Sequence, residues 1–195
     1  MATVVHPHVE HPRIQPWEYA GLQADAGWCL PIEFIEGEAV VISPIGDAAS
    51  AVQGELFLAL RGWQERVGDE GVLRQDVFVA FAPDEHLAPD ICWWSAGRRP
   101  PVVQGEVDVV PDLVVEVLSP STRANDLGPK RAVYMRTGVR ELWLADPDAS
   151  TITRVPADPG RAVDAGQDEV LSQGNSLRSD LLSGFTLELA RVFRH

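Results

Sequence analysis

Two helices are predicted from the pattern of apolar and polar positions along the chain. One stretch has apolar residues three or four positions apart: Val52, Leu56, Leu60 and Trp63. This spacing predicts an amphipathic helix over residues 51–67, with Asp47 or Ser50 as its cap. A second helix is predicted over residues 125–137 and ends at Gly138.

Alternation with period two and short apolar runs predict the strands. These cover residues 32–35, 39–42, 72–81, 91–94, 113–118 and 141–145. The run 113–118 is almost wholly apolar, as expected of a central strand covered on both faces. A weak hairpin among turns is expected over 156–176, and the apolar segment 181–193 closes the domain. The order of elements predicts an α/β fold with a central mixed β-sheet flanked by helices and extra strands at both ends.

The length of 195 residues fits one domain, which we expect over residues 16–195 after a flexible tail of residues 1–15. A short helix is expected at residues 17–24. Cys29 and Cys92 have no paired spacing and are expected to be reduced, buried thiols. The chain has neither a signal-peptide pattern nor an apolar run long enough to span a membrane, so we expect a cytoplasmic protein without a membrane partner.

The net charge of −13 argues against non-specific binding to nucleic acid, which depends on cations that neutralise phosphates. Two features would reverse this argument: a bound divalent ion, or arginines gathered on one face. The candidates for such a face are Arg98, Arg99, Arg123, Arg131, Arg136 and Arg140.

Glu116 stands inside the apolar strand predicted at residues 113–118. An ionised carboxylate buried there costs several kcal/mol, on the order of the desolvation of an unpaired charge, unless it is paired, hydrogen-bonded or bound to a metal. Strand alternation places Asp112 on the same face, as a second acid at its edge. The alternatives are an edge-facing glutamate and a buried salt bridge with an arginine.

Asp90 follows Pro89 and begins the strand predicted at residues 91–94. If that strand is antiparallel to the next one, Asp90 and Glu116 lie within reach of one cation. Carboxylate oxygens suit Mg²⁺ or Mn²⁺, whereas zinc is disfavoured because no His/Cys cluster has zinc spacing.

Lys130 is the only lysine among sixteen lysine and arginine residues. A lysine is a compact charge whose pKa moves on burial, which suits proton transfer or stabilisation of an oxyanion. Lys130 lies early in the second predicted helix, with Asp126 and Tyr134 four residues away on either side and on the same stripe. The alternatives are compositional drift and a surface pair with Asp126, worth only tenths of a kcal/mol, roughly.

The stretch from Pro111 to Pro147, with Glu116, Lys130 and Tyr134 at its centre, resembles the core of the Uma-type family. The similarity extends to residues 33–38, 88–90 and 183–185, and so covers about residues 30–193. Members of that family are bacterial proteins classed as putative restriction endonucleases, within the PD-(D/E)XK nuclease superfamily. The resemblance implies a restriction-endonuclease-like fold.

The resemblance also implies roles for individual residues. It makes Asp90 the aspartate of the Pro-Asp element and Glu116 the second acid, with Lys130 as a lysine that has moved onto the following helix. The usual lysine position, two residues after the second acid, is Leu118 here, and Glu55 is a loose match to the helix acid.

The function implied is a Mg²⁺-dependent endonuclease that hydrolyses phosphodiester bonds in DNA. Asp90, Glu116 and the backbone carbonyl of Val117 would hold the ion, and Lys130 would act on the water or on a phosphate oxygen. A homodimer is expected by analogy with nucleases that cut both strands. RNA and branched DNA stay open as substrates.

The alternative is a catalytically inactive nuclease-fold module for protein interaction or dimerisation, which the net charge favours. A partner face would then use apolar residues for which core packing is the default expectation: Trp93, Trp94 and Phe193.

Overall fold

The fold is described from a computed structural model, for residues 32–41, 45–101, 105–156 and 168–194. The predicted tail at 1–15, the predicted helix at 17–24, Cys29 and the last residue of the predicted strand at 39–42 lie outside these residues.

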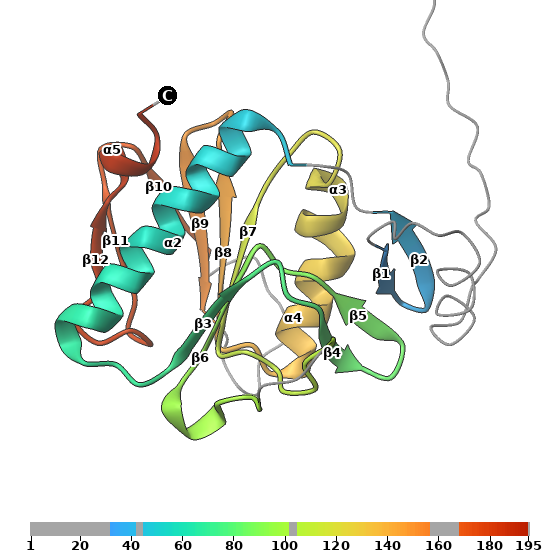
Figure 1. The fold of residues 1–195 in the computed structure, drawn as a ribbon. Coiled ribbons are helices and arrows are strands. Elements are labelled where there is room, and N and C mark those ends of the chain that lie inside the picture. The colour runs from blue at the N-terminus through green and yellow to red at the C-terminus, as the bar shows by residue number, and fades with distance from the viewer. Residues whose placement is uncertain (1–31, 42–44, 102–104, 157–167, 195) are drawn as a thin grey trace, which may run out of the picture.

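A six-stranded mixed sheet forms the centre of the molecule (Figure 1). The order across the sheet is β10 (Glu169–Ser172), β9 (Thr151–Pro156), β8 (Glu141–Asp146), β7 (Leu113–Val117), β6 (Ile91–Trp94) and β3 (Val72–Gln75). Neighbours are antiparallel except β7 and β8, which are parallel and joined by a helical segment. The predicted mixed sheet is therefore confirmed.

Helices cover both faces of this sheet (Figure 1). On one face lie α2 (Asp47–Val67) and the short α5 (Leu189–Val192). On the other lies a continuous helical segment made of α3 (Arg123–Asn125), the π-helical turn η2 (Asp126–Lys130) and α4 (Arg131–Thr137). A 3-10 turn, η1 (Ala96–Arg98), follows β6.

Two smaller sheets complete the architecture. One has the order β2 (Glu38–Val41), β1 (Ile32–Ile35), β5 (Glu85–Leu87) and β4 (Val79–Ala82). The other pairs β11 (Ser176–Arg178) with β12 (Thr186–Glu188). The extra strands expected near both ends of the chain are therefore present.

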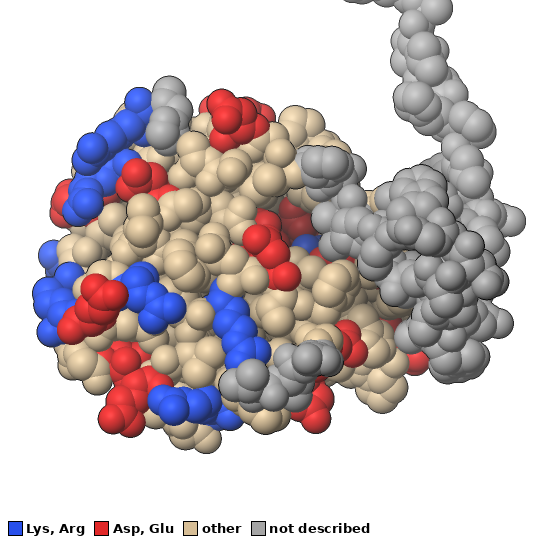
Figure 2. Space-filling model, viewed as in Figure 1, with Lys and Arg blue, Asp and Glu red and all other residues tan. Residues whose placement is uncertain are grey.

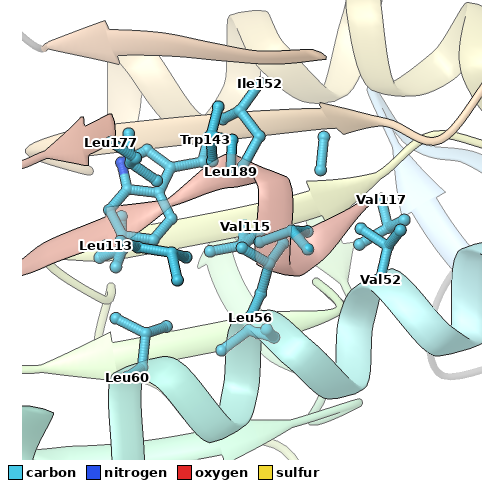
Figure 3. Packing of buried hydrophobic residues seen from close by; sticks show 14 of the residues in the cluster. Val52, Leu56, Leu60, Leu113, Val115, Val117, Trp143, Ile152, Leu177 and Leu189 are labelled. Carbon is cyan, nitrogen blue, oxygen red and sulfur yellow. The ribbon is translucent and has the colours of Figure 1, made fainter. Parts of the chain in front are cut away.

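The hydrophobic core is divided into two clusters by the central sheet. The stripe predicted on α2 is buried against β7 and β8 on one face, where Leu56 and Leu60 are fully enclosed (Figure 3). Truncating either leucine to alanine would cost about 2–5 kcal/mol. The second cluster joins the opposite face of β7 and β8 to α4 and the small sheet. Trp93, Trp94 and Phe193 are buried, so core packing accounts for them.

Three predicted elements differ from the structure by more than one residue at a boundary. The helix α2 begins at Asp47 rather than residue 51, with Gly46 as N-cap and no side-chain cap. The strand predicted at 72–81 is two strands, because Asp76 adopts a left-handed backbone (φ 49°) that ends β3 and directs the chain into the small sheet. The second helix begins at Arg123 and contains the π-helical turn.

No helix within the described ranges combines the length and apolar character needed to cross a membrane.

Candidate active site

The candidate site lies where β7 ends and β6 begins. Because these strands are antiparallel, with Ile91 opposite Val115, Asp90 is placed beside Glu116. The Val117 amide donates a hydrogen bond to Asp90 Oδ2 at 2.5 Å, and the Asp90 amide makes a long contact of 3.5 Å to Glu116 Oε2. Strand pairing thus places the backbone of Asp90 beside the Glu116 side chain, and both residues line one pocket.

Lys130 is the cation at the centre of the site. Its Nζ lies 2.8 Å from Glu116 Oε1, 3.0 Å from Glu33 Oε1 and 3.2 Å from Asp126 Oδ1. The lysine is only 5% exposed, so it does not form the surface pair considered above. Its contact with Glu116 also replaces the arginine partner considered for that glutamate.

The π-helical turn η2 carries both Asp126 and Lys130. Pro129 lies inside this turn and has no N–H to offer to the regular helical ladder. Turns of this kind recur at functional sites. Here Asp126 and Lys130 both have buried side chains directed toward β7, and Tyr134 on α4 follows them on the same face and donates a hydrogen bond to Glu116 Oε1.

These side chains line a pocket of about 430 Å³, within the range of small-molecule sites. Among the described residues of its lining, five are acidic and Lys130 is the one basic residue. The acids are Glu33, Asp76, Asp90, Glu116 and Asp126. With every group ionised, five negative charges against one positive charge leave the lining at −4. Figure 2 shows acidic atoms at a hollow on this face, with Lys and Arg gathered mainly away from it.

Burial and this excess of acid govern the protonation of the site. Burial raises the pKa of Asp90 from 3.8 to about 6, against the opposing effect of the hydrogen bond from Val117. Burial also raises the pKa of Glu116 well above its usual range, although Lys130 opposes the shift. For Lys130, burial alone would lower the pKa, but Glu116, Glu33 and Asp126 outweigh it and raise the pKa. The amine therefore stays protonated, and additional positive charge would favour ionisation of both acids.

Two residues expected to support the site lie elsewhere. Asp112 is at the opposite end of β7, about 13 Å from Glu116 at 3.3 Å per residue. Its carboxylate accepts hydrogen bonds from the Ser95 amide and from Arg98, both at 2.8 Å. Glu55 does not line the pocket; Gln53 is the α2 residue that does. A shared strand face was therefore not enough to place Asp112 in the site, and a loose family match was not enough to place Glu55 there.

Three polar residues that contact or adjoin the acids and the lysine of the site were not predicted from the sequence: Glu33, Gln53 and Asp76. Glu33 on β1 accepts a hydrogen bond from the Ala88 amide at 2.9 Å in addition to its contact with Lys130. Gln53 donates to Asp76 Oδ1 at 3.0 Å and to the Asp90 carbonyl at 3.1 Å. Both are buried polar residues on otherwise apolar faces, the signal that identified Glu116. No comparable signal marked Asp76.

The arginines considered for a basic face are largely engaged with acids. Five of them form ion pairs: Arg98 and Arg140 with Asp112, Arg123 with Asp146, Arg131 with Asp168, and Arg136 with Glu85. The sixth, Arg99, donates a hydrogen bond to the Glu70 carbonyl. None of the six lines the pocket.

The family model of Uma2, described as putative restriction endonucleases, matches residues 27–190. The chain therefore belongs to the Uma2 family, as the resemblance implied. It is also similar to the crystal structure of a putative nuclease of family DUF820 from Anabaena variabilis ATCC 29413. That match has a TM-score of 0.69 and 21% sequence identity, and it covers 89% of this chain and 97% of the other. It supports the restriction-endonuclease-like fold. Among curated proteins, none matches the chain.

Proposed function

We propose that the protein is an endonuclease that hydrolyses phosphodiester bonds in DNA with the help of Mg²⁺ or Mn²⁺. The observation that carries the proposal is the convergence of Asp90, Glu116 and Lys130 in one acidic pocket. Membership of the Uma2 family supports the same class of activity.

The donor set fits a hard divalent cation. No group of three or more His, Cys, Asp or Glu within the described ranges is arranged to hold a metal by itself. Magnesium, however, is usually held by one or two carboxylates together with waters and substrate phosphates. Asp126 adds to the negative charge of the pocket: its buried Oδ1 shares Lys130 Nζ, 3.2 Å away, with Glu33 and Glu116, so acid exceeds base among the described lining residues.

Asp90 and Glu116, with the Val117 carbonyl, are the groups that would hold the ion. When bound, such an ion acidifies a water molecule and offsets negative charge on the reacting phosphate. The Val117 amide fixes one oxygen of Asp90, and Tyr134 fixes one oxygen of Glu116, so both carboxylates are oriented beforehand. Pre-organisation of this kind lowers the reorganisation needed during reaction.

Lys130 acts as a hydrogen-bond donor and a positive charge in this scheme. Three carboxylates hold it protonated, so it orients the attacking water or neutralises a non-bridging phosphate oxygen rather than removing a proton. Arginine has a longer, planar head that does not fit a buried site built around one compact amine.

The test is cleavage of plasmid and oligonucleotide DNA in Mg²⁺, in Mn²⁺ and in a chelator. We expect Asp90→Asn, Glu116→Gln and Lys130→Arg each to lower cleavage at least 100-fold, on the order of the loss of one group that stabilises the transition state. Asp112→Asn is the matched control, a buried acid on the same strand that should leave the specific activity of the folded protein unchanged. A wild-type protein that cuts no DNA in either metal would contradict the proposal.

The second candidate is a non-catalytic module, favoured by the net charge of −13 and by the arginines already paired with acids. Calorimetry with Mg²⁺ separates the two functions. Absence of binding, or binding that Glu116→Gln leaves unchanged, favours the module. A homodimer, expected by analogy because nucleases that cut both strands usually use two sites, is tested by sedimentation equilibrium.

A further inference from the structure

The acidic pocket also has apolar residues in its lining. Among them are Val40 and Val41 of β2, Ile45 and Phe78. Val41 is 56% exposed and Ile45 is 43% exposed, unusual values for large apolar side chains beside buried charges. Phe78 is the only aromatic residue among the described residues of the lining. The pocket therefore offers apolar contacts, one of them aromatic, near the site that would hold the phosphate.

Polar side chains line the pocket as well. Asn125 and three hydroxyl residues of the β7–α3 loop belong to the lining: Ser119, Ser121 and Thr122. The hydroxyls contact one another, with Ser119 Oγ 3.0 Å from both Ser121 Oγ and Thr122 Oγ1. An asparagine amide supplies both donors and an acceptor, which is the pairing capacity that a base edge requires.

The pocket is poor in contacts for phosphate. Among the described residues that line it, Lys130 is the only cation, and that amine already contacts three carboxylates. Binding to duplex DNA draws its affinity chiefly from several cations along the backbone. A base in a duplex is also stacked and paired, so it cannot enter a pocket without being extruded. Recognition of a nucleic acid by this pocket must therefore rely on contacts with a base more than on contacts with the sugar-phosphate backbone.

We propose that this pocket receives an unpaired nucleobase adjacent to the scissile phosphate, with Phe78 and Val41 against its face. The substrate is then a DNA strand that is single-stranded at the cut, as in a flap or a gap. This inference rests on the proposed function, because it places the base beside the phosphate held at Asp90 and Glu116.

Cleavage rates with Mg²⁺ test the inference on two substrates of one sequence, a labelled single strand and its perfect duplex. We expect the wild type to prefer the single strand at least 10-fold. Base stacking is worth about 1–3 kcal/mol, so Phe78→Leu should lower kcat/KM on the single strand by about 5- to 150-fold. Val41→Ser should lower it less, and Val170→Ser is its matched control, an exposed valine (64%) outside the pocket lining.

Calorimetry provides a test that does not depend on cleavage. In Mg²⁺, thymidine 5′-monophosphate should bind more tightly than deoxyribose 5-phosphate, and Phe78→Leu should remove the difference. If this difference is seen but no nucleic acid is cut, the base pocket stands and the proposed function fails. If duplex is cut as well as single strand and Phe78→Leu changes neither rate, the base pocket is wrong and the proposed function stands. Faster cleavage of a matched single-stranded RNA would overturn the choice of DNA.

Discussion

Replacing Asp90 with asparagine is expected to stabilise the protein in the absence of divalent ions, although the residue is proposed to be essential for activity. Asp90 has a pKa of about 6 in the folded protein, against an ordinary value of 3.8, and burial is the main cause. Folding therefore favours its protonated form, and the ionised carboxylate opposes folding. Asparagine has a similar shape without the charge.

The size and pH dependence of the effect follow from this shift. Below pH 4 the carboxyl is protonated in both states, so the charge makes no difference between wild type and variant. Between pH 4 and 6 the unfolded chain ionises first, and the wild type loses stability. A shift from 3.8 to about 6 corresponds to about 3 kcal/mol, and because Asp90 is partly exposed we expect about 1–2 kcal/mol above pH 6. For a chain of this length that is about 2–8 °C in Tm.

Thermal and urea unfolding at pH 4 and pH 8, in a chelator and in Mg²⁺, provide the measurement. In the chelator, Asp90→Asn should be more stable than wild type at pH 8, with a smaller advantage at pH 4. In Mg²⁺ the wild type should gain stability, whereas the variant should gain little, because it lacks a proposed ligand. A variant that is no more stable than wild type in the chelator at pH 8 would refute the claim that the ionised Asp90 carboxylate destabilises the fold.

Three further substitutions test the charge balance of the site. Lys130→Met leaves buried carboxylates unpaired and should lower the free energy of unfolding in urea by about 3–5 kcal/mol at pH 8. Part of this loss should be recovered at low pH, where the carboxylates are protonated. Unchanged stability would argue against the buried contacts. Tyr134→Phe removes the hydrogen bond to Glu116 and should lower the free energy of unfolding by about 1.5–3 kcal/mol in the same assay. A smaller loss would mean that this bond is weak. Asp112→Asn should lower the free energy of unfolding by about 2–4 kcal/mol, because its ion pair with Arg98 is lost. The affinity for Mg²⁺, measured by calorimetry, should stay unchanged. An altered affinity would connect Asp112 to the site.

The central features of the fold could be predicted because local patterning dictates them. The α2 stripe allows only one buried face, the apolar run of β7 requires a strand covered on both faces, and β6 was located to the residue. The break between β3 and β4 was missed, although three polar residues in succession, Arg74 to Asp76, interrupt the alternation where the left-handed backbone of Asp76 ends the strand. The pairing of β1 with β5 depends on contacts distant in sequence, which no local pattern encodes.

The candidate site was partly predictable for a related reason. Glu116 is a charged residue within an apolar strand, and Lys130 is the only lysine of the chain. Both are buried charges, and residues that depart from the local pattern in this way often lie at functional sites. Glu33 has the same character, but its link to Lys130 arises only when β1 packs beside the turn before β6. Asp112 was misassigned because a shared strand face says nothing about position along the strand.

The most direct test of the central claim is anomalous diffraction from crystals soaked in Mn²⁺. The account predicts an ion between the carboxylates of Asp90 and Glu116, at about 2.0–2.2 Å from their oxygens, as for Mg²⁺, and its loss in Asp90→Asn. An empty pocket at saturating Mn²⁺, or an ion bound only elsewhere on the protein, would contradict it.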